Sequence, residues 1–357
     1  MNQFLSVFAA LIDNIRNILL ISKSHISSCT NTAQLLKSEV YQMRIGGITY
    51  VSRKTHKLRT FFIVIVILAL LASIIISTIS AYIAWNILHP EKEAIKPFSS
   101  NIVPDYSNIS IPVGDKGITL SGWFFKKLDS DRTVILAHDY GKNRLQFEES
   151  TMNIVKGFLN NGYNVLTFDF RNSGKSGGSL TSMGVLEKDD LIAVINYTTK
   201  YHNSKHIVLM GFCTGATASI LAGSKAENVD AIILDSPFAD FDDYINYRAE
   251  KWHLPLKLFR YTIPKAVKIL GNINTDEVSP MGAIINLSPR PVLFIHGKDD
   301  SSIPASNSME LYALYSKTNS NNTELWEVEG AGHLGSYNKN PETYMSRVLK
   351  FLDKVYS

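Results

Sequence analysis

The sequence predicts an α/β fold: a doubly wound, mostly parallel sheet with a helical cap, preceded by one N-terminal transmembrane helix. Two observations support this prediction. An apolar run without any charged residue covers positions 61–88, and from position 107 onward apolar strand-like runs alternate with helical ones. That alternation is typical of parallel strands joined by helices. A chain of 357 residues, 45% of them hydrophobic, is long enough for one large domain and a membrane segment.

Residues 1–58 are predicted to form a cytoplasmic N-terminal segment, to which no function is assigned. The first 22 residues place apolar side chains on one face of a helix, a pattern that favours an amphipathic helix lying on a membrane. Two alternatives stay open: the segment is loosely ordered, or the chain begins at Met43 instead of Met1.

Residues 59–88 are predicted to cross the cell membrane once. The run has no charged residue after Arg59 and exceeds the about 20 apolar residues that a spanning helix needs. A cleavable signal peptide would be shorter and would begin nearer to the N-terminus. Basic residues are concentrated before the run, at positions 53, 54, 57 and 59. By the positive-inside rule, the N-terminus is cytoplasmic and the rest of the chain is extracytoplasmic.

Residues 89–106 contain three prolines and are predicted to be an extended linker, followed by an α/β domain over residues 107–357. The first two strands of this domain are separated by GDKG, which favours an antiparallel hairpin. The stretch at about 240–283 is predicted to form a cap over the sheet. The predicted strands are 108–113, 118–125, 133–138, 163–170, 206–211, 231–236, 291–297 and 324–330. The predicted helices are 145–161, 185–201, 214–226, 305–317 and 341–355.

The segment Gly211-Phe212-Cys213-Thr214-Gly215 joins a predicted strand to a helix of small residues. It has the pattern of the nucleophile elbow G-x-S-x-G, with cysteine in place of serine. The flanking glycines allow a strained turn that exposes the central side chain. A thiol is a sufficient nucleophile when it is paired with a histidine, so Cys213 is a candidate catalytic residue.

Two later strand ends carry candidate partners for Cys213. The seventh predicted strand ends in HGKDDSSIP, and the last is followed by AGHLGSY. On these motifs, residues 107–357 resemble the α/β-hydrolases, close to the serine-aminopeptidase-like and dienelactone-hydrolase-like branches and to the membrane-anchored bacterial type. The resemblance implies that Asp300 is the catalytic acid and His333 the base, with Asp299 as the alternative acid. The order Cys213, Asp300, His333 is the order of the triad in that family.

The resemblance also implies an oxyanion hole. The family usually carries His-Gly after the third strand, whereas this chain has His138-Asp139-Tyr140-Gly141. By position, the backbone N–H groups of Tyr140 and Thr214 would hold the developing oxyanion. Asp139 departs from the family pattern, because a carboxylate there opposes negative charge in the site.

Neither a metal nor a cofactor is predicted. His202 and His206 are four residues apart but have no third ligand near them. The stretch FDFRNSGKSGG ends like a nucleotide-binding P-loop, but Asp169 stands where that motif needs its first glycine, so no nucleotide is expected. Asp169 and Arg171 are expected to hold this loop against the catalytic loops. The net charge of +4 comes mainly from the first sixty residues, and no nucleic-acid-binding motif is visible.

The predicted function is hydrolysis of a carboxylic ester, thioester or related acyl bond through a covalent acyl-enzyme on Cys213. The expected partners are a small-molecule acyl substrate and the lipid bilayer around residues 59–88. Peptidase and acyltransferase activities stay open, as does a catalytically impaired α/β-hydrolase that acts as a binding or scaffold protein. Cys29 and Cys213 lie on opposite sides of the predicted span, so no disulfide is expected.

Overall fold

The computed structural model describes residues 55–97, 103–114, 117–242, 244, 245, 247 and 256–357. It divides into two compact units, Met1–Val66 and Ile67–Ser357, and the sheet, cap and site described below all belong to the second. The predicted amphipathic helix near the N-terminus lies outside the described residues.

Within the described residues, eight strands form one sheet, and each corresponds to a strand that the sequence predicts. They are β1 (Ser107–Val113), β2 (Ile118–Phe125), β3 (Arg132–Ala137), β4 (Asn164–Phe168), β5 (His206–Phe212), β6 (Ala231–Asp235), β7 (Val292–Gly297) and β8 (Thr323–Val328). Their order is β1-β2-β4-β3-β5-β6-β7-β8. β2 is antiparallel to both β1 and β4, and the other neighbours are parallel. The predicted fold class is therefore confirmed.

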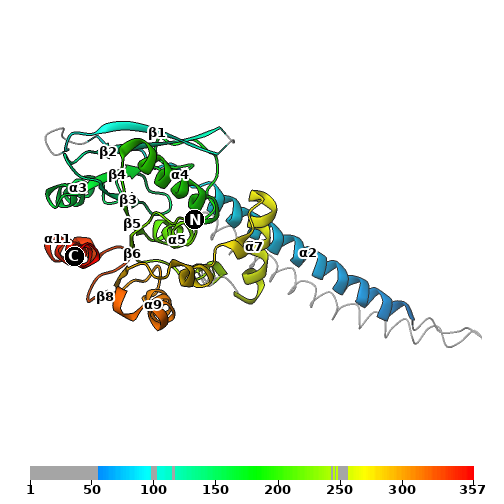
Figure 1. Cartoon of the computed structure of the whole chain (residues 1–357). Coiled ribbons are helices and arrows are strands. Elements are labelled where there is room, and N and C mark those ends of the chain that lie inside the picture. The colour runs from blue at the N-terminus through cyan, green and yellow to red at the C-terminus, as the bar shows by residue number, and fades with distance from the viewer. Residues whose placement is uncertain (1–54, 98–102, 115–116, 243, 246, 248–255) are drawn as a thin grey trace, which may run out of the picture. The chain divides into compact units, whose positions relative to one another are not determined.

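Helices cover both faces of the sheet (Figure 1). α3 (Thr151–Asn160) and α11 (Pro341–Val355) lie on one side, and α4 (Val185–His202), α5 (Thr214–Gly223) and α9 (Ser306–Asn319) lie on the other. Strands β4, β6 and β7 are buried along their whole length, as expected for central strands covered on both faces.

One predicted helix begins later than the sequence suggests. The pattern predicted a helix from residue 145, but α3 begins at Thr151. The reason is that side chains hold the preceding backbone: the N–H of Arg144 donates to Asp169 and that of Leu145 to Asn143. The preceding segment is therefore a loop fixed by hydrogen bonds that ends in a 3₁₀ turn (Glu148–Ser150), and it carries part of the site.

The described part of the predicted cap contains α7 (Leu256–Gly271), a 3₁₀ turn (Thr275–Glu277) and the short α8 (Pro280–Ala283). α7 is amphipathic. It buries Phe259, Ile263 and Val267, which are four residues apart and therefore lie on one face.

The apolar N-terminal helix is α2 (Thr55–Leu88), and from Arg59 to Leu88 it is long and apolar enough to cross a membrane, with mean hydropathy 3.1. Its last turns belong to the second unit and pack against the α/β domain, because Ser80, Ala84 and Leu88 are buried. The hydroxyl of Tyr140 donates to the carbonyl oxygens of Asn86 (3.1 Å) and Ile87 (3.0 Å). The end of the apolar helix is thus bonded to the loop after β3.

Candidate functional site

Cys213 lies in the sharp turn between β5 and α5, as the elbow motif predicts. Its φ is +48°, a left-handed conformation that a residue with a side chain rarely adopts. A Cβ atom at Gly215 would lie 2.1 Å from the carbonyl oxygen of Ala137, and one at Gly211 would lie 2.4 Å from that of Gly215. Only glycine fits at both positions, so the two glycines permit the turn that brings the thiol to the end of the sheet.

The structure brings Asp300 and His333 together. His333 Nδ1 lies 2.7 Å from Asp300 Oδ2, in hydrogen-bonding geometry. The other carboxylate oxygen accepts from the backbone N–H groups of Ser302 (2.7 Å) and Ile303 (2.8 Å). Cys213 Sγ lies within 4.8 Å of a ring nitrogen of His333. Asp299 is exposed, so the carboxylate that faces the histidine is Asp300.

A second histidine, His296, supports the acid and was not predicted from the sequence. It is fully buried, and its Nε2 lies 3.4 Å from Asp300 Oδ2 and 3.0 Å from the carbonyl oxygen of Ile303. Burial alone would raise the pKa of Asp300, but hydrogen bonds from His296, His333 and the Ile303 N–H outweigh it and hold that pKa well below its usual range. The signal was present in the strand-end pattern, where His296 precedes Gly297.

The carboxylate of Asp139 occupies the expected oxyanion hole. Its Oδ1 accepts hydrogen bonds from the N–H of Tyr140 (2.6 Å), the N–H of Thr214 (3.2 Å) and the hydroxyl of Thr214 (3.0 Å). These are the two backbone N–H groups that the sequence assigns to a developing oxyanion. The chain therefore fills its own hole with a negatively charged oxygen. The sequence showed that Asp139 departs from the family pattern, but it did not predict that the carboxylate would bind the two N–H groups.

Side chains of the same loop fix Asp139 in this position. The N–H of Asp139 donates to Gln146 Oε1 (2.6 Å), and that of Phe170 donates to His138 Nε2 (2.9 Å). Because His138 Nε2 accepts, the ring proton of a neutral His138 is on Nδ1, which then donates to the carbonyl oxygen of Asp139 (2.7 Å). Burial lowers the pKa of His138 and so favours this neutral form.

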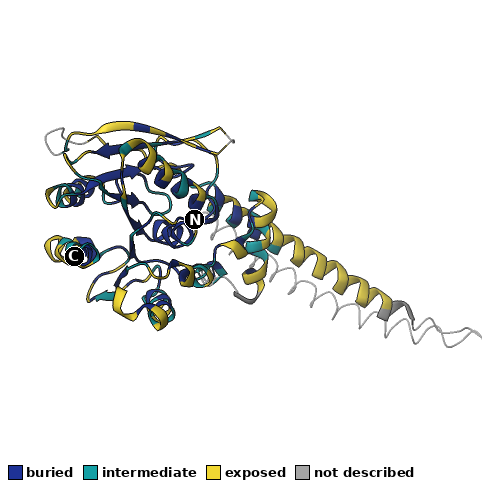
Figure 2. Cartoon of the chain, viewed as in Figure 1, coloured by how far each residue is buried: buried dark blue, intermediate teal, exposed yellow. Residues whose placement is uncertain are grey.

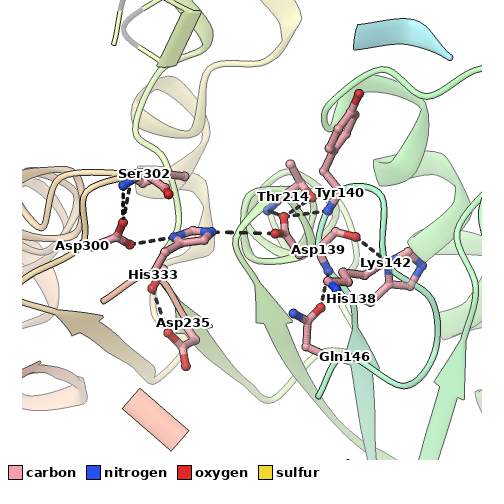
Figure 3. A network of polar contacts seen from close by, with 12 residues as sticks. His138, Asp139, Tyr140, Lys142, Gln146, Thr214, Asp235, Asp300, Ser302 and His333 are labelled. Carbon is pink, nitrogen blue, oxygen red and sulfur yellow. Dashed lines mark hydrogen bonds and ion pairs between the residues drawn. The ribbon is translucent and has the colours of Figure 1, made fainter. Parts of the chain in front are cut away.

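His333 lies between two carboxylates (Figure 3). Its Nε2 is 3.7 Å from Asp139 Oδ2, on the side opposite Asp300. Burial lowers the pKa of His333, but Asp139 and Asp300 together outweigh it and raise the pKa to about 10. For Asp139, burial raises the pKa, but the ion pair with His333 and the hydrogen bonds with Cys213 and Thr214 outweigh burial and lower the pKa overall. At neutral pH the resting site therefore contains an imidazolium between two carboxylates.

The same surroundings disfavour the thiolate form of Cys213. Cys213 is almost completely buried, and burial raises its pKa well above the usual range. The negative charge of Asp139 raises it further. A resting thiolate is thus disfavoured, and the nucleophile is activated only when its surroundings change.

Asp139, Cys213 and His333 could also hold a metal ion, since one ligand atom from each lies within 4.8 Å of the other two. Sulfur, imidazole nitrogen and carboxylate oxygen are all ligands of zinc. The bond from His333 to Asp300 would orient the imidazole, as carboxylates behind metal-bound histidines do. The arrangement therefore makes the site a candidate for inhibition by divalent metals.

Asp169 and Arg171 hold the neighbouring loops, as expected from the sequence. Asp169 is fully buried and forms an ion pair with Arg144 (2.7 Å), which belongs to the loop that carries Asp139. It also accepts from the N–H of Lys175 (2.7 Å). Arg171 pairs with Asp190 on α4. Because their charges are used in these pairs, both residues serve the structure of the site.

Comparisons with known proteins agree with this architecture. Residues 149–357 match the prolyl oligopeptidase family. The protein YqkD of Bacillus subtilis is 35% identical over 243 residues, which cover 67% of this chain and 77% of YqkD. The lysophosphatidylserine lipase ABHD12 of Danio rerio is 26% identical over 206 residues, which cover 56% of this chain and 52% of the lipase.

Among solved structures, an esterase of Pyrococcus furiosus, Pf2001, is similar with a TM-score of 0.61 and 30% sequence identity. The match covers 75% of this chain and 98% of the esterase, so nearly the whole esterase fold has a counterpart here. The resemblance that the elbow and the two strand-end motifs suggested is confirmed. The protein is a hydrolase of the α/β type, and the chain belongs to the prolyl oligopeptidase family.

Proposed function

We propose that the protein is a membrane-anchored hydrolase that cleaves a carboxylic ester, thioester or related acyl bond through Cys213, His333 and Asp300. One observation carries this proposal above the others: a strained elbow presents Cys213 beside His333, whose other ring nitrogen is bonded to the buried Asp300. A nucleophile next to a base that a third group orients is the arrangement of covalent acyl-transfer catalysis.

The first step is the exchange of Asp139 for the substrate. The carbonyl oxygen takes the place of Asp139 Oδ1 on the N–H groups of Tyr140 and Thr214. As the carboxylate moves away, the pKa of His333 falls, because one of its two anionic neighbours is lost, and the ring releases its proton to solvent. The neutral His333 is then able to act as a base.

The remaining steps follow from this geometry. The Cys213 thiol gives its proton to His333, and Sγ attacks the carbonyl carbon to form a tetrahedral oxyanion held by the two N–H groups. The C–O or C–S bond to the leaving group breaks, and His333 returns the proton to it. A water molecule that gives a proton to His333 then opens the thioester, which releases the acid and restores the thiol.

The acyl-enzyme gives the direct test. Brief incubation of the detergent-solubilised chain with a p-nitrophenyl ester is expected to add one acyl group to the peptide that contains Cys213, detected by mass spectrometry. Neutral hydroxylamine should remove the group, because it cleaves thioesters readily. Continued turnover with no label on Cys213 would contradict the proposed nucleophile.

The anchor and its orientation belong to the same proposal. α2 supplies a candidate span from Arg59 to Leu88, and the basic residues before it favour a cytoplasmic N-terminus and an extracytoplasmic hydrolase domain in the cell membrane. Protease added to intact cells is expected to digest the region beyond residue 107. If digestion occurs only in permeabilised cells, the hydrolase domain is cytoplasmic and the proposed orientation is wrong.

A second candidate function is favoured by one observation. A carboxylate that already fills the oxyanion hole is what a binding or scaffold protein with lost activity could tolerate. This candidate predicts that no substitution of Asp139 yields turnover.

A further inference from the structure

Exposure along α2 changes abruptly at residue 79. Between residues 59 and 78 every residue except Ile76 is exposed, whereas Ile79 and Ser80 are buried, as are Ala84 and Leu88 (Figure 2). The exposed part is about 30 Å long at about 1.5 Å per residue, which matches the hydrocarbon thickness of a bilayer. If α2 spans the membrane as proposed, it leaves the hydrocarbon near residue 78 and then enters its own domain.

The cap helix α7 meets α2 just beyond that point. The hydroxyl of Ser80 donates to the hydroxyl of Thr262 on α7 (2.7 Å). Farther along, Gly271 at the end of α7 lies against the side chain of Leu88. Figure 1 shows α7 beside this end of α2. The first half of α7 therefore lies at the level at which α2 emerges, and its last residues lie farther from the membrane.

The outward face of this first half is apolar and basic. Leu258 is 47% exposed and Tyr261 is 64% exposed, whereas Phe259 and Ile263 of the same half are buried; at the distal end of the helix Ile269 and Leu270 are exposed as well. Arg260 and Lys265 are exposed beside them. The sequence of α7 contains four basic residues and no acidic one, and the carboxylates of Asp276 and Glu277 come only after its distal end.

Two exposed aromatic residues of α2 lie at the same level. Tyr82 and Trp85 follow residue 78 by about 6 and 10 Å along the helix, within reach of the headgroup region. Tyrosine and tryptophan prefer this region, because their rings are apolar and their O–H and N–H groups are polar. Exposed apolar, aromatic and basic side chains of α2 and α7 thus lie near the level at which α2 emerges. We call this set the interfacial face: Tyr82, Trp85, Leu258, Arg260, Tyr261 and Lys265.

We propose that the interfacial face docks on the surface of an anionic lipid bilayer, so that the cap lies on the membrane beside the anchor. This inference rests on the proposed membrane anchoring through α2. Leu258 and Tyr261 enter the headgroup boundary, and Arg260 and Lys265 pair with lipid phosphates, as on interfacial amphipathic helices. The last turn of α2 accepts hydrogen bonds from the hydroxyl of Tyr140, and the N–H of Tyr140 lies in the oxyanion hole. Tyr140 therefore links the membrane-proximal helix α2 to the site.

The test measures the depth of a fluorophore in the reconstituted full chain. Single cysteines are introduced as Leu258→Cys or Tyr261→Cys in a Cys29→Ser/Cys213→Ala background and labelled with a small fluorophore. The chain is reconstituted into vesicles of phosphatidylcholine and phosphatidylglycerol that carry nitroxide quenchers on the headgroups. The matched control is Leu128→Cys, at an exposed position in the loop between β2 and β3.

Labels at 258 and 261 are expected to be quenched at least about twofold more than the label at 128, since only they lie in the headgroup region. Replacing both Arg260 and Lys265 by glutamine is expected to reduce that difference, and so is omitting phosphatidylglycerol. Equal quenching at 128 and 261 would overturn the docking. So would quenching at 261 that depends on the protein density in the vesicle, because a second copy would then cover the face.

A label at Ile67→Cys separates this inference from the anchoring on which it rests. With acyl-chain quenchers, strong quenching at 67 and none at 258 or 261 leaves α2 in the bilayer and overturns only the docking of α7. Absence of quenching at 67 shows that α2 is not inserted, and both proposals then fail.

Discussion

Cys213→Ala is expected to lower kcat/KM for p-nitrophenyl esters by about a thousandfold or more, because it removes the proposed nucleophile and leaves only binding and polarisation of the carbonyl. His333→Ala is expected to cause a loss of similar size. The double variant should be no slower than the single ones, since the two residues act on the same step and their effects are not additive. Initial rates of the detergent-solubilised chain measure all three.

Cys29→Ser is the matched control, because Cys29 is the other cysteine of the chain and is remote in sequence from the elbow. It is expected to keep the rate of the unmodified chain and to remain labelled by thiol reagents at Cys213 alone. If Cys213→Ala and His333→Ala hydrolyse the ester at the rate of the Cys29→Ser chain, the hydrolysis does not proceed through the elbow. The proposed triad is then wrong.

The elbow was accessible to sequence reasoning because backbone constraints are local, whereas Asp300 was predicted only from the resemblance of its motif to the α/β-hydrolases. Gly211 and Gly215 fit a turn that only glycine permits, and their spacing around Cys213 is visible in the chain. The central strands β4, β6 and β7 were equally visible, since runs that are buried on both faces contain few polar residues. These features depend on neighbours within a few residues.

What the sequence missed depends on side chains that meet across the fold. Asp139 and Thr214 are 75 positions apart, and no local sequence pattern predicts that the carboxylate points toward two N–H groups rather than toward solvent. His296 is a similar case, because its role follows from the way the loop from Asp300 to Ile303 folds back over it. The burial of Ser80, Ala84 and Leu88 was hidden for another reason: an apolar helix face that packs on protein looks the same as one that meets lipid.

Asp139→Gly is expected to raise kcat/KM by about tenfold to a hundredfold near neutral pH. In the unmodified chain the substrate must first displace a carboxylate held by three hydrogen bonds. A hydrogen bond to a charged group contributes about 1.5–3 kcal/mol, and each 1.4 kcal/mol of barrier is about tenfold in rate. Glycine leaves the N–H groups of Tyr140 and Thr214 free for the carbonyl oxygen.

Asp139→Asn separates the effect of the negative charge of Asp139 from the effect of its side chain filling the oxyanion hole. The amide oxygen can still accept from the two N–H groups, but the negative charge beside His333 and Cys213 is gone. The pKa of His333 is expected to fall from about 10 toward its ordinary value, and the thiol pKa is expected to fall as well. Alkylation of Cys213 by iodoacetamide at neutral pH should therefore be faster in Asp139→Asn than in the unmodified chain, whatever happens to turnover.

The pH dependence of activity and of stability follows from the raised pKa of His333. A histidine whose pKa is raised on folding stabilises the folded state fully below its unfolded pKa of about 6.5, and this contribution is lost as the pH rises through about 10. The unmodified chain should thus gain activity and lose stability as the pH rises toward 10. In Asp139→Asn the gain of activity should occur nearer to neutral pH, and the loss of stability should be smaller, because the folded and unfolded pKa values of His333 are then closer together. Rates and thermal unfolding measured over this range check both.

An inactive Asp139→Gly chain would decide between the remaining roles of Asp139. If it unfolds normally and Cys213 is alkylated faster, the thiol is activated as argued and yet does not turn over, so Asp139 itself takes part in the reaction. If alkylation is also unchanged, the charge of Asp139 does not control the thiol, and the binding or scaffold function gains support. A gain of activity leaves one consistent account: Asp139 closes a competent site, and substrate opens it by taking the place of the carboxylate on Tyr140 and Thr214.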